Sequence, residues 1–150
     1  MSPFSESSPP PGARAVLLSV KPRYADQIVD GTKQVEFRRI WAHEPVHWIA
    51  IYSSSPAQKI VGIVEVESVV TASASTLWKL NGSRGGGLTR TELRSYFSGK
   101  ATGYAVMLGQ VLRPKVPIEP AKIVQGFRAP QSFRYLTNAE VMRLSRSFKP

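Results

Sequence analysis

Two segments with β-strand character follow one another in the middle of the chain, with no helical segment between them. Residues 47–53 are apolar and include Trp48, and residues 59–70 are rich in valine and isoleucine. The first segment ends in Ser53, which Ser54, Ser55 and Pro56 follow, and a proline there ends strand pairing. A parallel α/β sheet needs a helix between successive strands. This region therefore excludes that class and favours an α+β fold.

The other segments extend this pattern to a small mixed β-barrel of five to six strands with short flanking helices. Further strands are predicted at residues 15–20, 31–39 and 103–112 and, more weakly, at residues 116–124. Helices are predicted from Pro22 to a left-handed cap at Gly31, over residues 75–80, and after the capping boxes that begin at Thr89 and Thr137.

The 150 residues suit one domain with two flanking parts. Residues 1–14 contain the run Ser-Ser-Pro-Pro-Pro-Gly and are predicted to be a disordered tail. Residues 15–136 form the predicted domain. Residues 137–150 are predicted to form a C-terminal helix that packs on it.

The formal net charge of +10 makes an anionic partner the main expectation. A field of that sign attracts phosphate backbones, so we favour RNA or another nucleic acid. Anionic membrane surfaces and acidic proteins would be attracted in the same way, and the charge does not choose among them.

Other classes are excluded by what the sequence lacks. No apolar run approaches the ~20 residues that span a bilayer, and residues 1–12 are polar where a signal peptide would be apolar. The chain has no cysteine and only two histidines, with Pro45 between them. We therefore expect a cytoplasmic protein that has no membrane partner, no metal site and no cofactor.

Residues 31–39 crowd three cations and one carboxylate around two apolar residues. On a regular strand, Lys33 would share the apolar face with Val35, and Glu36 would lie on the opposite face. A lysine at the rim of an apolar core is a local inconsistency of the kind that often marks a site. The alternative is an edge strand with a solvated charged face.

Residues 125–136 interleave aromatic and cationic side chains. This mixture binds single-stranded nucleic acid, because rings stack on bases and cations contact the backbone. The alternative is that the aromatic residues pack across the barrel.

The run Gly-Thr-Lys-Gln-Val-Glu-Phe-Arg at residues 31–38 resembles the Gly-x-Lys-x-x-Glu-x-Arg signature of ASCH domains, a family with a PUA-like fold. Its setting agrees, with Leu-Leu-Ser-Val-Lys-Pro at residues 17–22 and Pro-Gln-Ser-Phe-Arg-Tyr at residues 130–135. The resemblance covers residues 15–136. It implies a pseudo-barrel whose cleft, beside the first helix, accepts RNA or a modified nucleoside.

The leading hypothesis is an RNA-binding module that is not an enzyme. In it, Lys33 and Arg38 hold a phosphate or a base edge, and Glu36 orients its basic neighbours. The predicted nucleic-acid-binding residues are Lys21, Lys33, Glu36, Arg38, Arg39, Tyr52, Ser53, Ser54, Gln131, Ser132 and Tyr135.

The alternative hypothesis is a hydrolase that uses Lys33. The resemblance extends to small ASCH amidohydrolases that deacetylate N4-acetylcytidine, and Lys33 matches their lysine. Their threonine, however, is replaced by Glu36, and the loop that should supply a distant acid reads Gly85-Gly86-Gly87. Ribonuclease chemistry is a further enzymatic possibility, but the sequence indicates no pair of carboxylates for acid–base cleavage.

Overall fold

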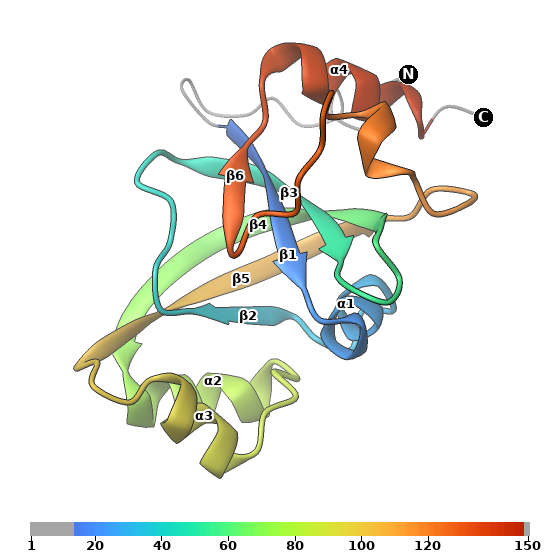
Figure 1. Cartoon of the computed structure of the whole chain (residues 1–150). Helices are drawn as coiled ribbons and strands as arrows, with labels where there is room; N and C mark the ends of the chain where they lie inside the picture. Colours follow the sequence, from blue (N-terminus) through green and yellow to red (C-terminus); the bar gives the residue numbers. More distant parts are fainter. Residues whose placement is uncertain (1–13, 149–150) are drawn as a thin grey trace.

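The computed structural model describes residues 14–148, in which a single six-stranded sheet is flanked by helices (Figure 1). The strands are β1 (Arg14–Val20), β2 (Val35–Arg38), β3 (Val46–Ser53), β4 (Lys59–Ser73), β5 (Thr102–Leu112) and β6 (Phe133–Tyr135). The helices are α1 (Pro22–Val29), α2 (Ala74–Ser83), α3 (Arg90–Tyr96), α4 (Asn138–Arg146) and the short 3-10 helix η1 (Pro120–Lys122).

The sheet is open, so the predicted barrel is wrong, whereas the α+β class and the six strands are confirmed. The strand order is β2-β5-β4-β3-β1-β6, with β1 and β3 parallel and every other pair antiparallel. The end strands β2 and β6 are four and three residues long and do not pair with each other. Instead, the side chain of Arg38 on β2 reaches Ser132 beside β6.

The predicted helix boundaries are largely confirmed, because local side chains determine them. Pro22 occupies the first turn of α1, and Gly31 follows its end with φ of +86°. Both capping boxes form, at Thr89 for α3 and at Thr137 for α4. Each capping threonine accepts a backbone N–H of the first turn, which satisfies a group that the helix leaves unpaired.

Two predictions for the C-terminal third are wrong. Residues 116–124 do not form a strand: only Ile118 bridges to Ile60, and η1 follows. Pro117 and Pro120 lack the N–H groups that a strand would donate to its neighbour. Conversely, no strand was predicted within residues 125–136, but this segment contains β6, which pairs antiparallel with β1.

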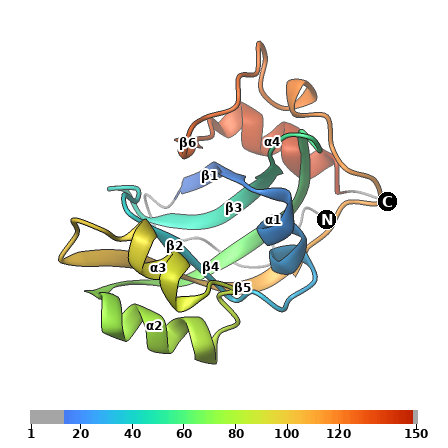
Figure 2. The same ribbon diagram turned by 60° about the horizontal axis from the view of Figure 1, so that its bottom comes forward.

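The helices cover different regions of the sheet (Figure 2). The α4 helix lies over β1 and β3 and packs Leu144 into a core with Leu17 and Ile63. The α2 and α3 helices lie at the other end of the molecule, where Leu77 and Leu93 pack in a separate core beside β2. No helix within residues 14–148 has the length and apolar character needed to cross a bilayer.

The predicted tail at residues 1–14 lies outside the described residues, except for Arg14, which belongs to β1.

Candidate functional site

A pocket of about 500 Å³ opens where β1 ends, α1 begins, and β2, α3 and the segment before β6 come together. Its volume lies in the range of about 300–1,000 Å³ that is typical of small-molecule sites. Six of the predicted site residues line it: Lys21, Lys33, Glu36, Arg38, Ser54 and Gln131.

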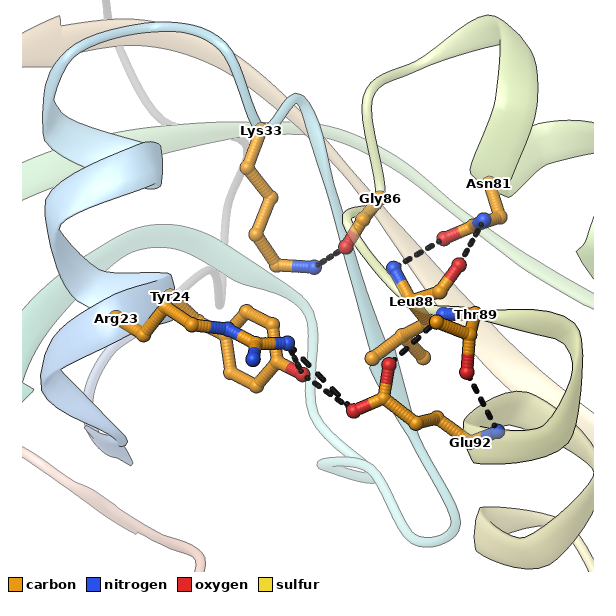
Figure 3. A network of polar contacts seen from close by, with 8 residues as sticks. All are labelled: Arg23, Tyr24, Lys33, Asn81, Gly86, Leu88, Thr89 and Glu92. Atoms are coloured by element: carbon orange, nitrogen blue, oxygen red, sulfur yellow. Dashed lines mark hydrogen bonds and ion pairs between the residues drawn. The ribbon is translucent and has the colours of Figure 1, made fainter.

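Lys33 is buried in the wall of this pocket, with only 3% of its surface exposed. Its ammonium donates a hydrogen bond to the carbonyl of Gly86 (Figure 3). The same ammonium lies 3.7 Å from the carboxylate of Glu36. The rings of Tyr24 and Phe37 lie 5.1 and 5.7 Å from the ammonium nitrogen. Burial lowers the pKa of Lys33, and the charge of Glu36 opposes that shift.

Lys33 and Glu36 meet in the same pocket, so the prediction that they point to opposite faces is wrong. That prediction assumed a regular strand from residue 31, but β2 begins only at Val35. The chain before it leaves α1 through a turn, and the N–H of Lys33 bonds to the carbonyl of Gln27. The two-residue alternation of a strand therefore does not extend back to Lys33.

Glu36 lies between two cations. Its carboxylate is 3.2 Å from the guanidinium of Arg38, in addition to its contact with Lys33. Arg38 also donates a hydrogen bond of 2.7 Å to the hydroxyl of Ser132. A buried carboxylate with two cationic partners fixes the positions of both.

The glycine-rich loop that contacts Lys33 is held in one conformation. The side-chain NH₂ of Asn81 donates a hydrogen bond of 2.8 Å to the carbonyl of Leu88, and the side-chain oxygen of Asn81 accepts one of 3.0 Å from the N–H of Leu88 (Figure 3). A Cβ atom on Gly85 would lie 2.0 Å from the carbonyl oxygen of Thr32. The close approach of this loop to the residues before β2 therefore requires glycine, and it directs the carbonyl of Gly86 toward Lys33.

A second polar group joins α1 to α3 beside the pocket. Arg23 donates to the hydroxyl of Tyr24 at 2.6 Å, and both lie near Glu92, at 3.5 and 3.4 Å (Figure 3). Burial, followed by the charge of Glu92, raises the pKa of Tyr24. The backbone N–H of Thr89 bonds to Glu92 and lowers the pKa of that carboxyl.

Tyr24 and Glu92 are pocket residues that the sequence analysis did not identify. Each lay in a predicted structural element that accounted for it: Tyr24 in the helix that begins at Pro22, and Glu92 in the capping box that begins at Thr89. The signal for Glu92 was its place as the first carboxylate after Gly85-Gly86-Gly87, the loop from which an acid was expected.

Tyr52 and Ser53 do not line the pocket, although the sequence analysis placed them in its floor. Tyr52 is buried in the core beneath α4, where its ring lies 5.1 Å from that of Phe127. Ser53 is buried at the end of β3, paired with Lys59. Of the three serines, Ser54 is the one that lines the pocket.

Three further predicted residues do not line the pocket. Ser132 contributes through its bond to Arg38, whereas Arg39 donates to the backbone carbonyls of Tyr96 and Ser98. Tyr135 lies beside Arg14, whose guanidinium is 4.4 Å from the ring centroid. Arg39 and Tyr135 are therefore held by other parts of the fold.

Comparison with known proteins finds several ASCH relatives. The ASCH domain profile matches residues 18–105. A Zymomonas mobilis subsp. mobilis protein named ASCH domain-containing ribonuclease is 32% identical over 139 residues, or 89% of this chain and 92% of that one. The crystal structure of ASCH from Zymomonas mobilis has a TM-score of 0.79 at 31% identity and covers 87% of this chain and 93% of that one. A serine-to-alanine variant of the Zymomonas mobilis protein has a TM-score of 0.80 at 29% identity, covering 90% and 96%.

Proposed function

Because this chain belongs to the ASCH domain family, we propose that it binds RNA and holds one nucleotide in the pocket around Lys33. The observation that carries the proposal is a buried ammonium in the wall of an open pocket, with the cations of Lys21 and Arg38 beside it. Burying a charge is costly, and a lysine kept in such a place is suited to an anionic or carbonyl-bearing ligand.

Lys33 retains capacity to bind a ligand. An ammonium has three donors: one bonds to the carbonyl of Gly86, and the carboxylate of Glu36 lies 3.7 Å away as an ion pair. Donor capacity therefore remains for a phosphate oxygen or for the carbonyl of a base.

RNA is favoured over other anions by the rest of the pocket and by the charge of the chain. Tyr24, Phe37 and Tyr96 line the pocket and offer aromatic surfaces, on which unpaired bases stack. The net charge of +10 attracts a phosphate backbone. A relative in Zymomonas mobilis is named a ribonuclease.

Binding of a labelled single-stranded RNA of about 16 nucleotides, measured by fluorescence anisotropy, tests the proposal. We expect Lys33→Met to weaken binding about 10-fold or more, because a bond to a charged group is lost. Lys79→Met removes an exposed cation outside the pocket and should change affinity less than about threefold. Equal affinities of the two variants would reject the pocket as the binding site.

A second candidate function is RNA cleavage in the same pocket. Glu36 and Glu92 both line it, so it holds the pair of carboxylates that the sequence did not indicate. In cleavage, Glu92 would take the proton of a ribose 2′-hydroxyl, and the 2′-oxygen would attack the adjacent phosphorus. The bond from phosphorus to the 5′-oxygen would break, and the ammonium of Lys33 would protonate the departing oxygen.

The protonation states favour these roles. The lowered pKa of Glu92 keeps its carboxylate ionised near neutral pH, and the lowered pKa of Lys33 makes its ammonium a stronger acid. Incubation of the protein with end-labelled RNA should give fragments with 2′,3′-cyclic phosphate ends. Glu92→Gln should abolish cleavage while RNA binding remains. Wild-type protein that binds RNA and leaves it intact would reject this second function.

A further inference from the structure

A second groove, of about 520 Å³, lies away from the Lys33 pocket and shares none of its lining residues. It lies between the loop of residues 113–119, η1 and the end of α4. In Figure 1 this region is beside α4, at the opposite end of the molecule from α2 and α3. The function proposed above does not account for it.

Three exposed cations line this groove: Arg113, Lys115 and Lys122. None of them forms an ion pair within residues 14–148. The one carboxylate of the groove, Glu119, is paired with Lys59 at 2.8 Å. The groove therefore presents positive charge that the described part of the chain does not neutralise.

Asp30 is a carboxylate outside the groove that interacts weakly with one of these cations, Arg113. Hydrogen bonds from Thr32 are the main cause that lowers the pKa of Asp30, and Arg113 adds a smaller contribution. Asp30 is thus held by Thr32 and interacts with Arg113 only through its charge. Since Thr32 immediately precedes Lys33, this interaction also places Arg113 near the segment that forms the first pocket.

The groove has an apolar surface between its cations. Val116 is 70% exposed there, and half-buried Phe148 lines the groove beside it. An aromatic and apolar surface flanked by cations is the combination that accommodates bases and phosphates of a single strand.

A smaller cavity links the pocket to β5. This cavity shares Lys33 with the pocket and is also lined by Leu108 and Val111 of β5, which ends directly before Arg113. The groove therefore begins about 13 Å, or four residues of extended strand, along β5 from a residue that shares this cavity with Lys33. A few nucleotides of RNA can span that distance.

We propose that this basic groove, formed by Arg113, Lys115 and Lys122 around Val116 and Phe148, is a second binding site for the backbone of the RNA held in the Lys33 pocket. This inference rests on the proposed RNA-binding function. It makes recognition bipartite: the pocket takes one nucleotide, and the groove takes phosphates farther along the strand.

The test compares the triple variant Arg113→Gln, Lys115→Gln, Lys122→Gln with a matched control, Lys79→Gln, Arg94→Gln, Lys100→Gln. The control removes the same number of exposed cations from residues outside both sites. Affinity is measured for RNAs of about 3 and about 16 nucleotides at several salt concentrations.

The groove variant should lose about 10- to 100-fold in affinity for the longer RNA at about 0.1 M salt, with a salt slope smaller by about 2. The control variant should lose far less, and neither variant should change binding of the short RNA. Equal losses in the two triple variants would overturn the groove while leaving the pocket intact. Failure of the wild-type protein to bind either RNA would overturn the proposed function itself.

Discussion

The state of Lys33 depends on two opposing effects. Burial disfavours the ammonium and lowers its pKa, whereas the carboxylate of Glu36 favours the ammonium. Between the lowered pKa and the ordinary value of 10.5, the unfolded chain binds more protons at this residue than the folded chain. The contribution of Lys33 to stability therefore rises with pH across that window.

Replacing Glu36 changes this balance in a predictable direction. In Glu36→Gln, the pKa of Lys33 should fall further, because the charge that opposes burial is gone. In Arg23→Gln, the pKa of Lys33 should rise, because the positive charge of Arg23 contributes to lowering that pKa. An NMR titration of the side-chain ammonium measures both shifts, and Lys79, which is exposed, provides the internal reference. A rise in Glu36→Gln would contradict this account of the site.

At this scale, the sequence predicted the pocket residues of one short segment and three from other segments, Lys21, Ser54 and Gln131. It missed Tyr24 and Glu92. Lys33, Glu36 and Arg38 lie within six residues of one another, and all three line the pocket. Glu92 reaches the pocket from α3, and its signal in the sequence was its place as the first carboxylate after the three glycines at residues 85–87. Tyr52 was predicted as a site residue, but its side chain packs in the core under α4. Ser54, two residues later, lines the pocket instead.

Among the elements, the end of α2 and the loop after it have the most direct effect on the site. Asn81 is buried at the end of α2, and both polar atoms of its side chain bond to the backbone of Leu88. The backbone carbonyl of Asn81 also accepts the N–H of Gly86. One side chain thus closes the loop whose Gly86 carbonyl contacts Lys33.

Asn81→Ala should lower the free energy of unfolding by about 2 kcal/mol, because two buried hydrogen bonds are lost at about 1 kcal/mol each. Urea unfolding measures this change. Hydrogen exchange at the Leu88 amide should also become faster, because its N–H loses its acceptor. Ser83→Ala, at an exposed residue of the same helix, should change stability by less than about 0.5 kcal/mol. Unaltered exchange at Leu88 would show that the loop is held by other contacts.

The success of sequence-based prediction differs between elements for a physical reason. Helix starts at Thr89 and Thr137 depend on residues three positions apart, so the sequence displays them. The short strand β6 forms only because β1 offers an unpaired edge, and its own residues do not reveal this. The predicted strand at residues 116–124 had apolar residues in suitable places, but its prolines left too few donors.

For the molecule as a whole, the sequence predicts the charge best. It predicts worst whether the sheet closes into a barrel. The net charge follows from composition alone. Closure depends on whether β2 and β6, nearly a hundred residues apart in sequence, meet edge to edge. They do not, and the Arg38–Ser132 hydrogen bond links the two edges instead.

The charge gives a prediction for RNA binding by the intact protein. The logarithm of the affinity should fall linearly with the logarithm of the salt concentration, by about 0.7 for each phosphate neutralised. With contacts at both sites, we expect a slope steeper than about −2 for an RNA of about 16 nucleotides. An affinity that does not change from low to moderate salt would show that the basic surface makes no phosphate contacts.

The order of the strands determines when the pocket can form during synthesis of the chain. The strand that follows Lys33 pairs only with β5, and the opposite wall of the pocket comes from residues 129–131. A chain emerging from the ribosome has therefore made Lys33 long before either partner exists. The pocket is completed only after about residue 131 has left the exit tunnel, long after Lys33 itself has emerged.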